Sequence, residues 1–245
     1  MKIVFLGTGD AYTTTNRGSV GILIPDEGIL LDTPPDILYK LNKINYDVSK
    51  IKSVFISHLH GDHAVGLLFL FLYSKYKSKK IFNLVLPRKS REKLSRAYKI
   101  FFDAPNLKKP KIFAKEVNTG EYTINGIKFF VKETRSTVNN LSYRLIINKK
   151  SIVYSGDTYD DLSNFAKNCN LLIHESAIMD EKYSKKYGHS TPFMAIQTAK
   201  KANANTLALV HLSKEVEKKI PIIKKYAKRN NVKLIIPNDL QQIEI

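Results

Sequence analysis

The stretch Ser57-His58-Leu59-His60-Gly61-Asp62-His63 directly follows the apolar run Val54–Ile56. It places four side chains of ligand type within six residues. Two histidines two positions apart on an extended segment point to the same side, and Asp62 and His63 then follow the turn of the chain towards a second point. Neutral imidazoles and carboxylates at this density are typical ligands of zinc, manganese or iron. The stretch therefore predicts a metal site, with a layout that suits two ions rather than one.

Short apolar runs bounded by Gly, Asp or Pro recur along the chain and predict strands. These runs are Ile3–Leu6, Val20–Ile24, Ile29–Leu31, Val54–Ile56, Ile81–Leu86, Ile127–Val131, Tyr143–Ile147, Ile152–Tyr154, Leu171–Ile173, Leu207–Val210 and Lys233–Ile236. Helices are predicted over Asp36–Lys43, Val65–Tyr76, Ser90–Phe102, Pro192–Ala202 and Lys214–Lys228. Asn125-Gly126 between Tyr122–Ile124 and Ile127–Phe129 indicates a hairpin, and Thr191-Pro192 indicates a helix start. This order predicts an α/β fold in which two stacked sheets are covered by helices, a four-layer αββα sandwich.

The composition is that of a globular chain. Of its 245 residues 43% are hydrophobic, which is ample for a core, and no linker or abrupt change of composition divides residues 1–245. A single domain is expected. The lone Cys169 excludes an internal disulfide and a zinc site built from several cysteines. The N-terminal apolar run is too short for a signal peptide, and Leu67–Tyr73 is far below the roughly 20 residues of a membrane span, so we expect a cytoplasmic protein without membrane contact.

The charge is strongly positive. The chain has 40 Lys and Arg against 22 Asp and Glu, a formal net charge of +18. Residues 64–115 alone hold fourteen basic side chains against Glu92 and Asp103, which leaves +12 in that segment. Such an excess favours a polyanionic partner such as RNA. A solvated lysine-rich surface without a role is the alternative. The apolar segment Leu67–Tyr73 predicts a core helix, with a homodimer interface as the alternative.

Four motifs carry a family resemblance. His58–His63 resembles the HxHxDH signature of the metallo-β-lactamase superfamily of hydrolases. Leu30-Leu31-Asp32-Thr33 resembles its first motif, whose Asp supports the ligands from behind, and Ser155-Gly156-Asp157-Thr158 resembles the motif with the metal-bridging carboxylate. Val210-His211-Leu212-Ser213 follows a strand, as the last histidine ligand does in the family. The resemblance implies the metallo-β-lactamase fold and two divalent metal ions, with zinc the first choice and manganese or iron as alternatives. The implied ligands are His58, His60, Asp62, His63, Asp157 and His211.

Within this superfamily the pattern is most similar to the ribonuclease Z branch, which matures the 3′ ends of transfer RNA. Phe5-Leu6-Gly7-Thr8-Gly9 with Arg17 resembles its opening, Leu171–Ala177 resembles its His-Glu-Ala-Thr segment, and Gly188-His189-Ser190-Thr191 resembles its His-Ser-Thr loop. By this resemblance a metal-bound hydroxide is the nucleophile and Asp62 orients or deprotonates it. His189 then donates a proton or hydrogen bond at the phosphate and Glu175 orients His189. His174 matches a supporting position, although a purely structural histidine there is the alternative.

Two departures from the family pattern stand out. The third motif places a histidine ligand about seven residues before a Tyr-Arg pair, and here that position, counted from Tyr143-Arg144, is Ser136. A serine hydroxyl is a poor zinc ligand at neutral pH, so the first site is expected to be weak or empty. In addition, only about twenty residues separate Ser136 from Asp157, where ribonuclease Z enzymes usually carry a protruding arm for transfer RNA.

These features predict a metal-dependent hydrolase, a phosphodiesterase or ribonuclease similar to ribonuclease Z, which acts on RNA or another phosphodiester. Two alternatives stay open. One is a hydrolase of small phosphodiesters such as cyclic nucleotides. The other is a nucleic-acid-binding protein with a degenerate metal site. Hydrolysis of β-lactams is not expected, because the Gly-His-Ser-Thr and Gly-Asp-Thr segments belong to the nuclease side of the superfamily.

Overall fold

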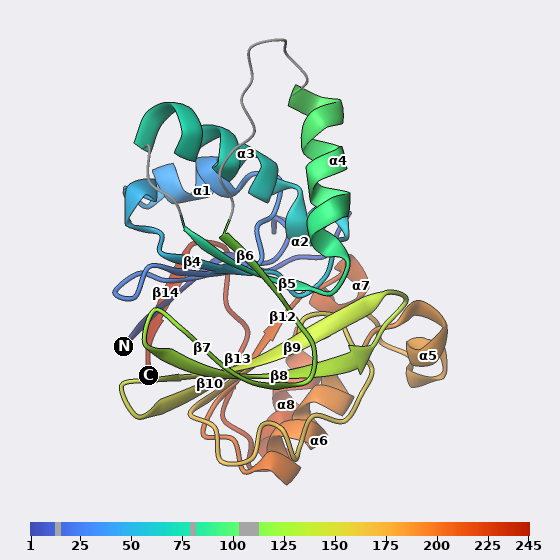
Figure 1. Ribbon diagram of the computed structural model, residues 1–245. Coiled ribbons are helices and arrows are strands. Elements are labelled where there is room, and N and C mark those ends of the chain that lie inside the picture. The colour runs from blue at the N-terminus through green and yellow to red at the C-terminus, as the bar shows by residue number, and fades with distance from the viewer. Residues whose placement is uncertain (13–15, 79–81, 103–112) are drawn as a thin grey trace.

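The computed structural model describes residues 1–12, 16–78, 82–102 and 113–245. Two seven-stranded sheets lie face to face, and helices cover the outer face of each, so the layers follow the order αββα (Figure 1). The predicted fold class is therefore confirmed. No helix in the described ranges is long and apolar enough to cross a membrane.

The first sheet is built mainly from the N-terminal half of the chain. Its outer β14 comes from the C-terminus and pairs antiparallel with β1, whereas β3 to β6 run parallel to one another. In spatial order its strands are β14 (Gln241–Glu244), β1 (Lys2–Gly7), β2 (Gly21–Ile24), β3 (Ile29–Leu31), β4 (Ser53–Phe55), β5 (Asn83–Pro87) and β6 (Phe113–Val117).

The second sheet comes from the C-terminal half. Its first strands form an antiparallel meander, and β10 to β13 are parallel. Asn125 and Gly126 both have positive φ, 49° and 76°, in the predicted hairpin turn. In spatial order the strands are β13 (Leu234–Ile235), β12 (Leu207–Val210), β11 (Leu171–Glu175), β10 (Lys150–Tyr154), β9 (Asn139–Ile147), β8 (Ile127–Arg135) and β7 (Gly120–Ile124).

The core consists of three apolar layers, because both faces of each sheet are covered. In β1, Ile3 and Phe5 lie in the layer between the sheets, whereas Val4 and Leu6 lie in the layer beneath the helices of the first sheet. A third layer packs the second sheet against its own helices. Strands buried on both faces need continuous apolar runs, which is why the sequence showed runs rather than strict alternation.

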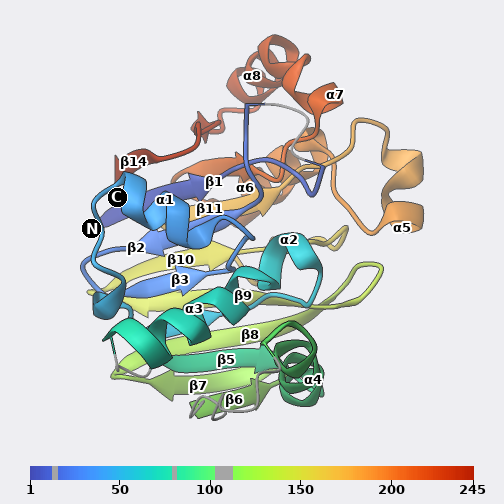
Figure 2. The same ribbon diagram turned by 90° about the horizontal axis from the view of Figure 1, so that it is seen from above.

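Helices occupy both outer layers (Figure 1), and Figure 2 shows α1, α2 and α3 lying over the strands. The first sheet is covered by α1 (Ile37–Lys43), α2 (Gly61–Ala64), α3 (Gly66–Tyr73) and α4 (Ser90–Phe102), and the second by α6 (Pro192–Ala202) and α8 (Ile220–Arg229). Short elements complete the described chain: α5 (Ser184–Tyr187), α7 (Lys214–Glu217), η1 (Val48–Lys50), η2 (Ser74–Ser78) and η3 (Glu181–Tyr183).

Several boundaries differ from the sequence prediction. The helix predicted over Lys214–Lys228 is two helices, α7 and α8, because Pro221 lies in the first turn of α8 and cannot continue a preceding helix. The helix predicted over Val65–Tyr76 is preceded by the helical turn α2 and ends at Tyr73, where η2 follows. Strands β6 and β14 were not predicted. Ile81, the predicted start of the strand that is observed from Asn83, lies outside the described residues.

Candidate metal centre

The candidate residues gather at one edge of the sandwich, where parallel strands of both sheets end. His58 and His60 follow β4, Asp157 follows β10, and His211 follows β12. Asp32 comes directly after β3, the parallel neighbour of β4. Carboxyl ends of parallel strands are where open α/β sheets place their ligands, since the loops there converge from separate parts of the chain.

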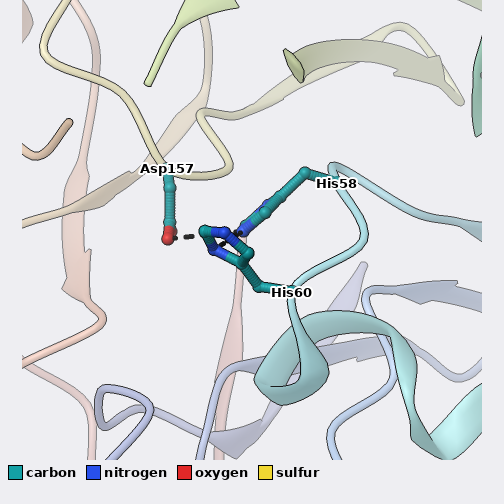
Figure 3. A group of neighbouring side chains, drawn as sticks. All are labelled: His58, His60 and Asp157. Carbon is teal, nitrogen blue, oxygen red and sulfur yellow. Dashed lines mark hydrogen bonds and ion pairs between the residues drawn. The ribbon is translucent and has the colours of Figure 1, made fainter. Parts of the chain in front are cut away.

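The first cluster consists of His58, His60 and Asp157 (Figure 3). His58 Nε2 lies 3.0 Å from His60 Nδ1 and 3.6 Å from Asp157 Oδ2. His58 and Asp157 are buried, whereas His60 is half-buried and borders solvent. Both imidazoles thus turn a nitrogen towards the same carboxylate.

The second cluster consists of Asp62, His63 and His211. Asp62 Oδ2 lies 3.2 Å from His63 Nε2 and 3.3 Å from His211 Nε2. Asp157 faces this cluster as well, with Oδ1 3.4 Å from His63 Nε2 and Oδ2 3.5 Å from His211 Nε2. The Asp157 carboxylate therefore lies between the two clusters.

The donor atoms have the spacing that a cation requires. The six distances between facing ligand atoms lie between 3.0 and 3.6 Å. Tetrahedral zinc with bonds of about 2.0–2.1 Å holds its ligand atoms about 3.3 Å apart. His63 Nε2 and Asp157 Oδ1 are buried and have no hydrogen-bond partner in the described structure. A divalent cation would satisfy both atoms, so the residues present fit a metal.

Protonation of these groups also suits ligation. Burial lowers the pKa of His58 well below its usual value, which keeps this imidazole neutral. Burial opposes charge on Asp62, but the hydrogen bond with His211 and the charge of the neighbouring His63 outweigh it and lower the Asp62 pKa. The Asp157 pKa is also lowered, because the charges of His211 and His63 outweigh its burial. Both carboxylates are therefore ionised at neutral pH.

Asp32 fixes the orientation of the ligands from behind. Its buried carboxylate accepts hydrogen bonds from the Ser57 amide and hydroxyl, each at 2.6 Å, from His63 Nδ1 at 2.7 Å and from Tyr154 Oη at 2.6 Å. Because the Ser57 hydroxyl gives its one proton to Asp32, it accepts from His58 Nδ1, 3.0 Å away. Ser57 and Asp32 thus hold the Nδ1 side of each imidazole, so Nε2 of each ring faces the site.

His189 and Glu175 form a pair beside the clusters. Glu175 ends β11 and is buried, and its carboxylate accepts from the amides of Thr158, Ser190 and Ala177 at 2.8–3.0 Å. His189 Nδ1 lies 3.2 Å from Glu175 Oε1. Burial acts to lower the His189 pKa, but the Glu175 carboxylate outweighs it and raises the pKa to about 9. A rigid carboxylate therefore holds a protonated imidazole at the site.

His189 also belongs to a third group of ligand-type atoms, with Asp157 and His211. Its Nδ1 lies 3.8 Å from Asp157 Oδ2, farther than its distance to Glu175. His189 is thus placed both to contact a phosphate at the clusters and to approach a metal ion there.

Two sequence candidates lie outside these clusters. Ser136 Oγ donates to the Gly188 carbonyl at 3.0 Å, so its hydroxyl ties the β8–β9 turn to the loop that carries His189. His174 is buried on β11, with Nδ1 2.8 Å from the Glu175 carbonyl and a buried Nε2 that has no hydrogen-bond partner in the described structure. His174 belongs to none of the groups of ligand-type side chains found among the described residues.

Sequence reasoning missed residues that position the ligands. Asn140 is fully buried, accepts from the Asp157 amide at 3.1 Å and donates to the Ser155 carbonyl at 3.0 Å. Its side chain also fills the space beside Gly156, where a Cβ atom would lie 2.3 Å from Asn140 Oδ1. Tyr154 was treated only as part of a strand. The spacing of the sequence offers no signal for either role, since their partners lie far away along the chain.

A cavity of about 680 Å³ opens over the clusters. Asp62, Asp157, His189 and His211 line its floor, and Tyr12, Tyr187 and Lys214 lie around it. This cavity gives a substrate access to the clusters.

Comparisons with known proteins show which proteins this chain resembles. Residues 1–235 match the family model described as "Anti-Pycsar protein Apyc1". A ribonuclease Z of Saccharolobus solfataricus is 28% identical, with 100% of this chain and 99% of that protein covered. A crystal structure of the short form of human tRNase Z has a TM-score of 0.81 at 22% identity and covers 100% of this chain and 99% of its own. The metallo-beta-lactamase fold protein YhfI from Bacillus subtilis has a TM-score of 0.82 at 21% identity, with 99% of both chains covered.

The structural matches show that the fold is the metallo-β-lactamase fold. Together with the ribonuclease Z relatives and the histidine–aspartate clusters, they identify a metal-dependent hydrolase that resembles ribonuclease Z. The fold and activity class expected from the sequence are thereby confirmed.

Proposed function

The chain belongs to the anti-Pycsar protein Apyc1 family, and we propose that it is a two-metal phosphodiesterase that acts on RNA. The observation that carries this proposal is the spacing of 3.0–3.6 Å between facing donor atoms, with the Asp157 carboxylate between two clusters. In this proposal the first site is formed by His58, His60 and Asp157, and the second by Asp62, His63, Asp157 and His211. Zinc is the metal we propose, because three imidazoles or carboxylates with an open position are typical of catalytic zinc sites.

The side chains divide the work of phosphodiester cleavage. Two bound divalent cations would lower the pKa of a water molecule and offset negative charge on the phosphate. Asp62 lines the cavity as an ionised carboxylate and can orient an attacking water by accepting a hydrogen bond from it. His189 carries a proton at neutral pH, is held by Glu175, and can donate to a phosphate oxygen or to the departing oxygen.

Removal of second-site ligands tests this function. We expect Asp62→Ala and His63→Ala to abolish hydrolysis of bis(p-nitrophenyl) phosphate in added zinc or manganese and to lower bound metal, measured by elemental analysis. Glu121→Ala is a control of the same residue class, because this exposed carboxylate pairs with Lys128 on the β7–β8 hairpin. Full metal occupancy in both variants would contradict the assignment.

A second candidate function is hydrolysis of a small phosphodiester. The segment from Ser136 to Asp157 contains only β9, β10 and their connections, without a protruding arm. The alignment with the Saccharolobus solfataricus ribonuclease Z spans 290 positions, more than the 245 residues of this chain, so that relative carries residues which this chain lacks. A chain without the arm has less surface with which to hold a folded RNA.

We also propose that the protein forms a single domain and assembles as a homodimer through α3 and α4. These helices expose large apolar side chains, with Phe69 41% and Ile100 76% accessible. Analytical ultracentrifugation should show the mass of two chains, and the double variant Phe69→Glu/Ile100→Glu should sediment as one chain. A monomeric wild type would refute this arrangement.

A further inference from the structure

A second cavity, the α4 cavity, adjoins the candidate metal centre. It has a volume of about 350 Å³ and lies between α4, the start of α3 and the β8–β9 turn. His60 lines both this cavity and the larger one over the clusters. A molecule with its phosphate at the clusters would therefore reach the α4 cavity by passing His60.

The walls of the α4 cavity are mainly apolar. Leu68 and Leu94 are almost fully buried in them, and Ala97 on the same face of α4 as Leu94 is half-buried. A phosphate or a sugar hydroxyl gains nothing from such walls, because burying a polar group without a hydrogen bond is unfavourable. The cavity volume lies in the range of ligand pockets, about 300–1,000 Å³.

Three polar side chains of this cavity lie on its exposed side, and the buried Ser90 and half-buried His60 also line it. Arg88, Lys93 and Asn139 line it and are exposed at its rim. The Asn139 side-chain amide offers both a hydrogen-bond donor and an acceptor. The positive charges of Arg88 and Lys93 favour negatively charged groups near the rim. An apolar floor with polar groups at the rim fits a flat ring that carries polar groups on one edge.

We propose that the α4 cavity binds the ring-bearing group on one side of the scissile phosphodiester, such as a nucleobase. This inference rests on the proposed phosphodiesterase function and adds to it the residues that select the organic part of the substrate. Leu68, Leu94 and Ala97 contact the ring faces, and Asn139 contacts its polar edge. The cavity thereby distinguishes diesters with a ring from those without one.

Two probes with the same leaving group test the proposal on the metal-loaded protein. Thymidine 5′-(p-nitrophenyl phosphate) carries a nucleobase, whereas methyl p-nitrophenyl phosphate carries a methyl group in its place. Ala97→Phe fills the cavity from within α4. Its kcat/KM for the thymidine diester should fall about tenfold or more, and that for the methyl diester should stay within about twofold. The Kd of thymidine 5′-monophosphate, measured by calorimetry, should rise in parallel.

Matched variants separate a filled cavity from a damaged protein. Glu92→Phe puts the same side chain on an exposed position of α4 outside the cavity. This variant should leave kcat/KM unchanged for both diesters. If Ala97→Phe does not fold, Val138→Trp can fill the cavity instead, because Val138 lies on the β8–β9 turn, lines the cavity and is partly exposed. Equal losses for both probes in a folded variant, or no loss for either, would overturn the proposal. A loaded wild type that hydrolyses neither probe would overturn the phosphodiesterase function itself.

Discussion

The contacts of His189 indicate its role at the candidate metal centre. Its Nδ1 faces the Glu175 carboxylate at 3.2 Å, closer than Asp157 at 3.8 Å, which favours a proton donor over a metal ligand. We therefore expect His189→Ala to lower kcat by about 10²–10⁴-fold, the usual contribution of a positioned acid. Bound metal, measured by elemental analysis, should not change. Loss of metal in this variant would make His189 a ligand instead.

Glu175→Gln provides the control for that experiment. The amide side chain can still accept from backbone amides, but it lacks the charge that raises the His189 pKa to about 9. The basic limb of the pH–rate profile should therefore move to lower pH in Glu175→Gln, since a group with a lower pKa loses its proton earlier.

Ser136 tests the completeness of the first cluster. That cluster offers three donor atoms, whereas the second cluster together with Asp157 offers four. Titration of the metal-free protein should accordingly show two unequal binding steps. Ser136→His should tighten the weaker step by adding an imidazole, and activity at limiting metal should rise.

Ser136→Ala is the matched control, since it removes the hydrogen bond to the Gly188 carbonyl without adding a ligand. His174 is not placed to supply the missing ligand, because its Nδ1 is held by the Glu175 carbonyl and it joins no ligand-type group among the described residues. Two equal, tight binding steps in the wild type would show that another residue completes the first site.

At the residue scale, the sequence predicted those site residues that share a local pattern. His58, His60, Asp62 and His63 lie in one short stretch, so their geometry is set by a single turn. Asn140 could not be found in this way, because its role depends on a contact with Asp157 that only the sheet arrangement creates. Family motifs added the distant ligands Asp157 and His211 and the supporting Asp32 and Glu175, whereas only a tertiary contact identifies Asn140.

At the element scale, prediction worked where burial was complete. The inner strands β1 and β11 were recognised because both of their faces are covered and their sequences are continuously apolar. The missed strands β6 and β14 are the two edges of the first sheet, and exposed positions interrupt both. Their sequences, Phe-Ala-Lys-Glu-Val and Gln-Gln-Ile-Glu, carry too few apolar residues to be told from a loop.

The ends of the helices were predicted incorrectly for a related reason. Helical periodicity continues from α7 into α8, and only Pro221 marks the break between them. The turn α2, which carries Asp62 and His63, contains no apolar stripe, because its side chains face the candidate metal centre rather than a core. Sequence rules based on apolar periodicity therefore do not predict an element such as α2, whose side chains face a functional site.

At the scale of the whole molecule, two stacked sheets bring distant motifs to one edge. His63 and His211 are separated by almost 150 positions, yet their rings stack with centroids 5.2 Å apart. His63 stands at the end of the first sheet and His211 at the end of the second, so the site exists only when the sheets are packed together. A destabilised sheet interface should therefore weaken metal binding, which makes stability and metal content interdependent.

The net charge of +18 has its structural counterpart near the α4 cavity. Arg88 and Lys93 line that cavity, and Arg91, Arg96 and Lys99 lie on the same helix or its approach. Five more basic residues of the segment predicted to bind nucleic acid, Lys79, Lys80, Lys108, Lys109 and Lys111, lie outside the described residues. Of the described cations, Arg88 and Lys93 line the α4 cavity, and His60 lines both this cavity and the cavity over the clusters.

This placement predicts a strong dependence of RNA cleavage on salt. Each phosphate that a cation neutralises releases counterions, so log(kcat/KM) for single-stranded RNA should fall with log[salt] by about 0.7 per phosphate contact. Hydrolysis of bis(p-nitrophenyl) phosphate by the same preparation should change little, because its single charge is met by the metal centre alone. In the double variant Arg88→Gln/Lys93→Gln, the slope of log(kcat/KM) against log[salt] for RNA should correspond to about one to two fewer phosphate contacts. Lys128→Gln on the β7–β8 hairpin should leave this slope unchanged. If RNA cleavage and diester hydrolysis respond to salt alike, the basic surface does not hold the substrate, and a small phosphodiester becomes the substrate that this site serves.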